Sequence, residues 1–263
     1  MKKIECIISD WAGTAVDYGC FAPVAAFIES FKAMGLSVTA EETRRFMGLT
    51  KIEEIRKLFA IDHVAEEFKK KNGRESSEND IMLCYDMFRN YLITTLADYA
   101  KPLPGVVEAF AALRDMGVKI GSTTGYTREM MDVVEPAAAA FGYKTDCCVT
   151  SEGLPGGRPL PYMIYKNMCE LNVPQLCSVV KYGDTIADIK EGVNAGVWSV
   201  GVILGSNEMG LTVEDVAKMT DNCLKKRMND VRYKMYAAGA DYVVDSVEEL
   251  PLLVEAINAR MNK

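Results

Sequence analysis

The sequence predicts an α/β protein with a doubly wound (Rossmann-like) parallel-sheet core and an inserted helical cap domain. Two observations predict the core: short apolar runs that end in small or polar residues, as buried parallel strands do, and helical patterns that separate the later runs. A third predicts the insertion, because residues 20–98 carry helical patterns and no convincing strand. In such a fold, ligand sites lie at the carboxyl ends of the strands.

The core elements follow one another along the chain. Five runs are expected to form strands: IECIIS at 4–9, VKIGST at 118–123, CSVVKYG at 177–183, SVGVIL at 199–204 and ADYVVDS at 240–246. Helical patterns lie at 105–116, 127–141, 160–171 and 186–195. The core domain is therefore expected to comprise residues 1–19 and 99–263.

The cap domain is expected at residues 20–98. Four segments with helical spacing occupy this region, at 22–35, 39–48, 51–61 and 78–100. The KPLPG sequence at 101–105 is typical of a turn and would return the chain to the core. A chain of 263 residues is long enough for a core and a smaller inserted domain. Whether residues 221–235 belong to the cap or to the core is left open.

The composition argues against several classes of protein. Hydrophobic residues make up 49% of the chain, which is typical of a globular protein, and a net charge of −7 gives no electrostatic footprint for nucleic acid. No apolar run reaches the roughly 18 residues of a membrane span, and no signal peptide is recognisable, so we expect a cytoplasmic protein without a membrane partner. The eight cysteines have no disulfide-framework spacing, and a single histidine, His63, argues against a zinc site.

A candidate nucleophile follows the first predicted strand. In SDWAGT at 9–14, Asp10 stands where a parallel sheet presents its ligands, and Gly13 lets the turn approach closely. The same hexapeptide also fits a plain turn in which the aspartate bonds nearby backbone N–H groups. Two residues after Asp10, where a partner acid would stand, the sequence has Ala12.

Two later segments favour phosphoryl chemistry at Asp10. Thr124 and Gly125 follow a predicted strand and precede a helix, where hydroxyl and backbone N–H groups can hold phosphate oxygens. Arg158 lies in the loop sequence GGRP and can place its cation against phosphoryl charge. These residues predict a phosphate-binding site next to the aspartate.

A metal site is predicted at the same edge of the sheet. Asp184 and Asp188, in KYGDTIADIKEG, have the i, i+4 spacing that places both on one side of a helix start. Asp10 and Asp184 together would supply the hard oxygen ligands that Mg²⁺ prefers. Asp188 is expected to hold these ligands in position without binding the ion itself.

The four motifs, in this order over about 175 residues, resemble those of the haloacid dehalogenase superfamily of phosphotransferases. A closer resemblance is to the phosphonoacetaldehyde hydrolase (phosphonatase) family. It is carried by DWAGTAVDYGCFAP, MGLTKIEEIR, GSTTGYTREMMD and VGVILGSNEMGLT, and it runs from the N-terminus to roughly residue 215.

The resemblance accounts for Ala12. In the superfamily's phosphatases an aspartate at this position protonates the departing alcohol. In a phosphonate the leaving group is a carbanion instead, which a carboxylic acid alone cannot rescue. A lysine imine with the substrate aldehyde would act as the electron sink, and the resemblance identifies Lys51 as that lysine. It also implies an aspartyl phosphate on Asp10, with Mg²⁺ bound by Asp10, the Ala12 carbonyl and Asp184.

Other positions of the motifs would contact the substrate. Lys51 also fits a solvated helix lysine and Met47 a core residue, but the similarity to MGLTKI places Met47 beside a reacting lysine. Tyr126 would line the site, or would simply cap its helix. Cys20 fits a core residue at the cap hinge and, alternatively, a residue that lines the pocket.

One position departs from the family pattern. Phosphonatases carry a histidine three residues after the Schiff-base lysine, and this sequence has Glu54 there, with no basis for moving His63 into the role. A glutamate can relay protons if a closed pocket raises its pKa. As an anion it would instead pair with Lys51, raise the pKa of the lysine and hinder imine formation. It can also mark a different aldehyde-bearing phosphonate as substrate.

The expected function is Mg²⁺-dependent hydrolysis of phosphonoacetaldehyde to acetaldehyde and phosphate. Two alternatives stay open: a phosphatase or phosphomutase of the same superfamily that acts on phosphate esters, and a non-catalytic sensor of a phospho-ligand. The resemblance also implies a homodimer formed through the cap. The apolar segment CFAPVAAFIESF at 20–31 would offer the surface for it.

Overall fold

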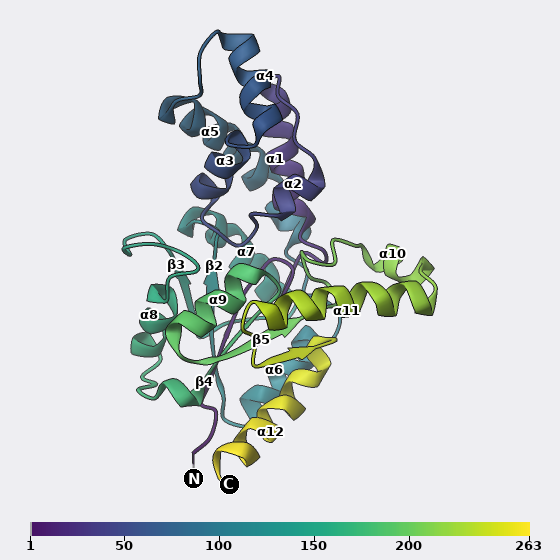
Figure 1. Ribbon diagram of the computed structural model, residues 1–263. Coiled ribbons are helices and arrows are strands. Elements are labelled where there is room, and N and C mark those ends of the chain that lie inside the picture. Colours follow the sequence, from purple (N-terminus) through teal and green to yellow (C-terminus); the bar gives the residue numbers. More distant parts are fainter. Residues whose placement is uncertain (1) are drawn as a thin grey trace.

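The core of the computed structural model, which describes residues 2–263, is one sheet of six parallel strands (Figure 1). The strands are β1 (Cys6–Ser9), β2 (Lys119–Thr124), β3 (Cys147–Thr150), β4 (Val179–Gly183), β5 (Trp198–Val202) and β6 (Tyr242–Val244). Their order is β3-β2-β1-β4-β5-β6. The order reverses between β1 and β4, which is where a doubly wound sheet binds its ligands. The predicted α/β core is confirmed.

Five of the six strands coincide with the predicted apolar runs, and β3 was missed. This strand lies at the edge of the sheet and begins with two cysteines that are only half-buried. A short edge strand with little burial produces no continuous apolar run, so the pattern that marks the central strands is absent.

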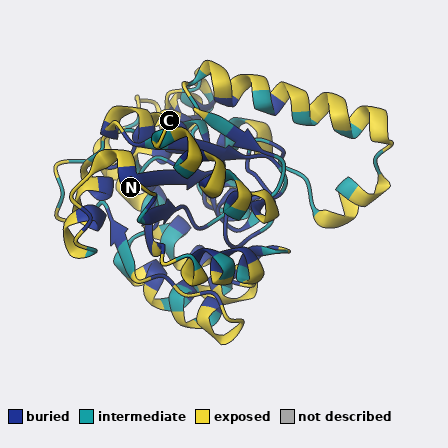
Figure 2. Cartoon of the chain, turned by 90° about the horizontal axis from the view of Figure 1, so that it is seen from below, coloured by how far each residue is buried: buried dark blue, intermediate teal, exposed yellow. Residues whose placement is uncertain are grey.

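Helices cover both faces of the sheet. The helices that follow residue 95 in the chain are α6 (Val106–Asp115), α7 (Arg128–Ala140), α8 (Tyr162–Glu170), α9 (Ile186–Ala195), α10 (Val213–Lys218), α11 (Asp221–Ala237) and α12 (Leu250–Met261), with short 3₁₀ turns η1 (Leu96–Tyr99), η2 (Leu176–Ser178) and η3 (Val247–Glu249). Of these, α10 buries none of its residues and does not cover the sheet. Ile7 packs in the same cluster as α6 and α12, whereas Cys6 and Ile8 pack with α8, as alternation along β1 requires. Figure 2 shows the buried strands between helices whose outer faces are exposed. No helix within residues 2–263 combines the length and the apolar character needed to cross a bilayer.

The 221–235 stretch belongs to the sheet side of the molecule. It forms most of α11, which packs against β6 and α9 through Val231 and Met235. The other end of α11 projects from the molecule with α10 (Figures 1 and 2). Because α11 buries so little of its surface, its sequence has weak helical amphipathicity and did not reveal where it packs.

Five helices lie between β1 and β2 and gather at one end of the sheet (Figure 1). They are α1 (Phe21–Ala33), α2 (Ala40–Arg44), α3 (Lys51–Phe59), α4 (Asp62–Asn72) and α5 (Glu78–Thr95), of which α4 was not predicted. They share an apolar interior in which the rings of Phe27 and Phe88 stack with centroids 4.3 Å apart. We call α1–α5 the helical group. The predicted division into domains at 19/20 and 98/99 stays a prediction.

One expectation about the helical group is wrong. The apolar side chains of the 20–31 segment were expected to offer a dimer surface, but Phe27 and Phe31 are both fully buried within the chain. Since α1 packs on α5, these rings form the interior of the helical group. The homodimer stays a prediction, and Phe27 and Phe31 do not contribute an exposed surface to it.

Candidate active site

Polar residues of the first, second and fourth strands meet at the carboxyl end of the sheet. Asp10 follows β1, Thr124 ends β2 and Asp184 follows β4. Because β1 lies between β2 and β4, the three side chains come from adjacent strands. All three are buried, with at most 5% of each residue exposed. The fold therefore gathers the predicted residues at the reversal of strand order.

A buried arginine holds the carboxylate of Asp10. Arg158, from the loop between β3 and α8, donates from Nη2 to Asp10 Oδ1 at 2.8 Å and to the carbonyl oxygen of Thr123 at 2.7 Å. Its other nitrogens pair with Asp188 and Glu191, each at 3.1 Å. The guanidinium is thus fixed by three carboxylates, and one of its edges faces Asp10.

Sequence reasoning missed Lys181. This lysine lies in the central strand β4, and its Nζ is 2.7 Å from Asp188 Oδ1 and 3.0 Å from Thr123 Oγ1. Although burial alone would raise the pKa of Asp188, Arg158 and Lys181 lower it to about 2. Asp188 is therefore an anion with two partners. A lysine inside a buried strand was the available signal, because an unpaired lysine is rarely buried.

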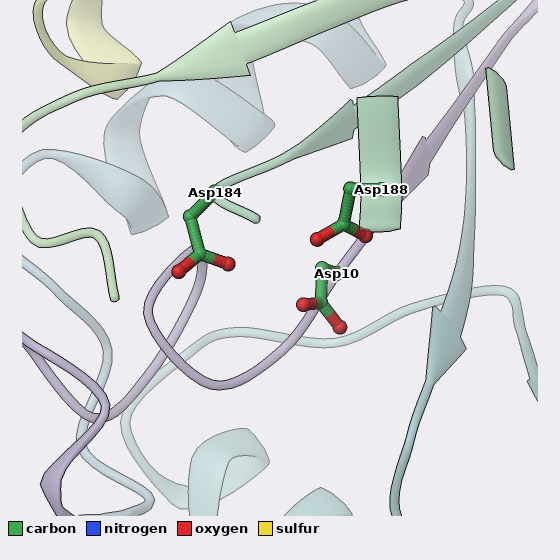
Figure 3. Close-up of side chains that lie close together, drawn as sticks. All are labelled: Asp10, Asp184 and Asp188. Atoms are coloured by element: carbon green, nitrogen blue, oxygen red, sulfur yellow. The ribbon is translucent and has the colours of Figure 1, made fainter. Parts of the chain in front are cut away.

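Three aspartates can hold a metal ion. Asp10, Asp184 and Asp188 each offer a carboxylate oxygen, and these oxygens lie within 4.8 Å of one another (Figure 3). The Oδ1 of Asp184 accepts from Thr14 Oγ1 at 2.8 Å, and its Oδ2 accepts from the backbone N–H of Asn207 at 2.7 Å. No lysine or arginine within residues 2–263 pairs with Asp184. Burial and the negative charges of Asp10 and Asp188 raise its pKa, and a cation would relieve that charge.

The turn after β1 brings its backbone against Asp184. Gly13 has a φ of 82°, and a Cβ at this position would lie 2.2 Å from Asp184 Oδ2. The expected close approach at this glycine is therefore present. Asp184 itself precedes α9, whose N-cap is Thr185, so a strand-to-helix turn rather than one helix face brings it to Asp188.

The helical group closes the site from above. One small cavity is lined by residues of the sheet and of the helical group: Asp10, Ala12, Cys20, Pro23, Met47, Gly48, Lys51, Thr124, Gly125, Tyr126, Arg158 and Thr185. Its volume is about 20 Å³, which is room for about one water molecule. Every residue predicted to contact the substrate lines this cavity. The structure is therefore closed around it.

Glycines allow the 47–50 loop to lie directly on the sheet side. A Cβ on Gly48 would lie 2.5 Å from Thr185 Oγ1, and one on Gly125 would lie 2.5 Å from the carbonyl oxygen of Leu49. A Cβ on Gly157 would lie 2.7 Å from Thr50 Cγ2. Any larger residue at these positions would push the loop, and with it the start of α3, away from the cavity.

Lys51 and Glu54 form a buried pair at the start of α3. The Nζ of Lys51 donates to both carboxylate oxygens of Glu54, at 3.0 and 2.9 Å, and lies 3.7 Å from Met47 Sδ. Glu54 is fully buried, and this burial raises its pKa to about 7 although Lys51 opposes the rise. The expected pairing is present, and Glu54 can exchange a proton near neutral pH.

Tyr126 and Cys20 form walls of the cavity. The Lys51 Nζ lies 5.5 Å from the centroid of the Tyr126 ring, within the range of a cation–π contact. Tyr126 does not cap α7, because Thr127 accepts the N–H of Met130 in that role. Cys20 is buried at the start of α1 and also lines the cavity. It is therefore both a buried residue at the base of the helical group and a residue of the cavity wall.

Sequence reasoning also missed Asp17. Its carboxylate accepts the N–H groups of Phe21 and Ala22 at 2.9 and 3.0 Å and so caps α1 from the turn that follows β1. Burial raises the pKa of Asp17 to about 6. The side chain therefore ties the first turn of the helical group to the strand that carries Asp10. No motif marks it, because an aspartate four residues before a helix N–H is common in turns.

Comparison with known proteins agrees with this geometry. A family model described as haloacid dehalogenase-like hydrolase matches residues 4–196. The phosphonoacetaldehyde hydrolase of Bacteroides fragilis is 55% identical over 262 residues, which is 100% of both chains. That of Bacillus cytotoxicus is 49% identical over 255 residues, 97% of each. A crystal structure of a phosphonoacetaldehyde hydrolase like protein from Oleispira antarctica superposes with a TM-score of 0.95 at 36% identity, covering 98% of this chain and 94% of that one.

Proposed function

The chain belongs to the phosphonoacetaldehyde hydrolases of the haloacid dehalogenase-like hydrolase family, and on this premise we propose that it hydrolyses the carbon–phosphorus bond of phosphonoacetaldehyde. The products would be acetaldehyde and phosphate. The observation that carries the proposal is the small cavity lined both by the carboxylate of Asp10, which follows β1, and by Lys51 of α3. Ala12 lines it too, where a phosphate-ester hydrolase would need an acid.

Lys51 would first form an imine with the aldehyde of the substrate. Its amine must lose a proton to attack the carbonyl carbon, and Glu54 lies within hydrogen-bond distance to accept that proton. A carboxylate whose pKa is about 7 can return the proton to the carbinolamine hydroxyl, which leaves as water. The protonated imine then draws electrons from the neighbouring carbon.

Asp10 would then attack phosphorus. The bond between carbon and phosphorus breaks, its electron pair forms an enamine on Lys51, and the phosphoryl group passes to the aspartate. Arg158 holds the attacking carboxylate in place and faces the phosphoryl oxygens, and Thr124 adds a hydroxyl to the same wall. Protonation of the enamine and addition of one water release acetaldehyde. A second water releases phosphate from Asp10.

A divalent cation fits the cluster of aspartates. The carboxylate of Asp184 is buried without a positive partner within residues 2–263, and Asp10 lies beside it. Asp10, Asp184 and the Ala12 carbonyl would hold Mg²⁺, while Asp188 is already paired with Arg158 and Lys181. The ion would offset the negative charge that gathers where the carboxylate meets the phosphonate.

Residues 20–98 would act as a cap that opens and closes. A cavity with room for about one water cannot admit a phosphonate, so the substrate requires the helical group to move from the sheet. Closing returns Lys51 to the cavity and excludes bulk water until both the imine and the carboxylate are placed.

The direct test is product analysis. With phosphonoacetaldehyde and Mg²⁺, we expect acetaldehyde and phosphate in equal amounts, and a much lower rate of phosphate release from p-nitrophenyl phosphate. Faster release from the ester would support the phosphatase alternative. Binding without either product would support the sensor.

Replacing Ala12 with aspartate is expected to raise phosphate-ester hydrolysis. The new carboxyl would reach the cavity as the missing general acid, and the expected gain is about 10²-fold, the low end of what such a group supplies. The rate with p-nitrophenyl phosphate measures it. Ala12→Asn, whose side chain has nearly the same shape but cannot act as a general acid, is the matched control, and an equal gain there would contradict the explanation given for Ala12.

Glu54 is expected to control the acidic limb of the pH profile. Only its ionised form accepts the lysine proton, so kcat/KM should rise with pH up to about 7. In Glu54→Gln the limb should vanish and the rate should fall by roughly 10²-fold. Glu54→His should restore a limb, because imidazole titrates in the same range. The exposed neighbour Glu53→Gln should leave the profile unchanged, and an unchanged profile in Glu54→Gln would remove Glu54 from the mechanism.

A further inference from the structure

Residues of α2 and α11, helices that are labelled in Figure 1, line a wide polar cleft beside the helical group. Its volume is about 750 Å³, within the range of small-molecule sites. Arg44 and Arg45 of α2 and its C-cap line one wall, and Arg227 and Lys234 of α11 line the other. The loop at 207–210, after β5, forms part of the lining between them. The cleft is thus built from both the helical group and the sheet side.

The cleft is positively charged in a chain whose net charge is −7. Two acids, Glu41 and Glu208, also line it. Lys234 lies 3.3 Å from Glu208, so these two charges offset each other. Over residues 2–263, the structure has no ion pair between a carboxylate and any of the three arginines. Glu41 is the remaining acid against three guanidinium groups.

Neutral oxygens hold two of these guanidinium groups in place. Arg227 donates from Nε to the carbonyl oxygen of Met209 at 3.0 Å, and Arg44 donates from Nη1 to Asn207 Oδ1 at 3.1 Å. The Nη2 of Arg44 is buried and has no hydrogen-bond partner among the described residues. Burial lowers the pKa of Arg44 and the charge of Arg227 lowers it further, whereas neighbouring acidic groups, Asp17 and Asp184 among them, raise it. Positioned guanidinium donors that form no ion pair with a carboxylate suit an oxyanion.

We propose that this cleft binds a small molecule through a doubly charged phosphoryl or phosphonyl group, held by Arg44, Arg45 and Arg227. The site is separate from the cavity at Asp10. Asn207 stands between them, because its backbone N–H bonds Asp184 while its side chain donates to the carbonyl oxygen of Arg44 at 3.1 Å. A ligand in the cleft contacts α2 and α11 together and so ties the helical group to the sheet side.

Calorimetric titration of the Mg²⁺-loaded full chain with inorganic phosphate tests the proposal. The double variant Arg45→Gln/Arg227→Gln should bind one phosphate fewer than the natural protein and should keep its turnover, since neither side chain lines the catalytic cavity. Both residues are exposed, so the fold is expected to persist. Lys225→Gln/Lys226→Gln removes the same amount of charge from an exposed part of α11 outside the cleft. This control should bind as many phosphate ions as the natural protein.

Hydrogen exchange gives a second measurement. Phosphate should slow exchange of the α2 backbone in the natural protein and should have no such effect in Arg45→Gln/Arg227→Gln. Equal phosphate stoichiometry in the natural protein and this variant would overturn the proposal. Loss of the same phosphate in the lysine control would overturn it too, because it would indicate diffuse attraction to α11 rather than a site.

Discussion

Replacing Lys51 with arginine is expected to abolish acetaldehyde release from phosphonoacetaldehyde, with kcat/KM lower by at least about 10³-fold. Arginine keeps the positive charge and can still pair with Glu54, so the buried ion pair and the fold should survive. Its guanidinium cannot form a comparable imine, so the carbanion would have no electron sink. Release is measured by coupling acetaldehyde to an NADH-dependent reduction.

The matched control for this variant is Lys57→Arg. Lys57 lies on the same helix, α3, and is exposed, so the same chemical change there should leave turnover unaltered. Near-natural acetaldehyde release by Lys51→Arg would show that the carbon–phosphorus bond breaks without an imine at this residue. That result would also contradict the proposal that the helical group closes in order to bring Lys51 to the substrate.

Replacing Asp10 with asparagine is expected to stop both products, with a fall of roughly 10⁴-fold or more, the scale on which loss of a covalent nucleophile acts. The amide nearly matches the carboxylate in shape but is a poor nucleophile. Arg158 keeps its pairs with Asp188 and Glu191, so its charge stays compensated. Product release and thermal unfolding together measure the effect.

This variant also separates the two halves of the mechanism. Lys51 remains intact, so borohydride added with phosphonoacetaldehyde should still fix the substrate on the protein, now with its phosphonyl group attached. Asp132→Asn, an exposed aspartate of α7, controls for the loss of one charge. Phosphate release that survives in Asp10→Asn would rule out an aspartyl phosphate at this position.

The sheet could be predicted from the sequence because its central strands are buried on both faces. Runs such as IECIIS and CSVVKYG are mainly apolar, and each ends beside a polar residue of the site. The edge strand β3 and the projecting helix α11 lack this property, so neither the strand nor the packing of the helix could be predicted. The extent of burial, more than the intrinsic helix or strand propensity of the residues, determined which elements could be predicted.

The position of a candidate site residue was predictable where the residue lies at a strand end. Asp10, Thr124 and Asp184 are of that kind. Lys181 and Asp17 were missed because their importance depends on what surrounds them: Lys181 neutralises Asp188, and Asp17 caps a helix of another part of the fold. Contacts across 170 residues, as between Thr14 and Asp184, leave no mark in local sequence.

Glu54 shows that the spacing of residues in a sequence does not reveal how deeply they are buried. The i, i+3 spacing from Lys51 made a pair expected, but spacing alone cannot distinguish an exposed ion pair from a buried one. The difference decides the chemistry, since burial is what raises the pKa of the glutamate to about 7.

The most direct test of the account is reduction with sodium borohydride during turnover, followed by peptide mapping. With phosphonoacetaldehyde and Mg²⁺, the natural protein should lose activity and carry an ethyl group on Lys51, which is the reduced imine of the acetaldehyde product. A protein that releases acetaldehyde yet keeps its activity through borohydride treatment, or is alkylated at another lysine, would contradict imine catalysis at Lys51.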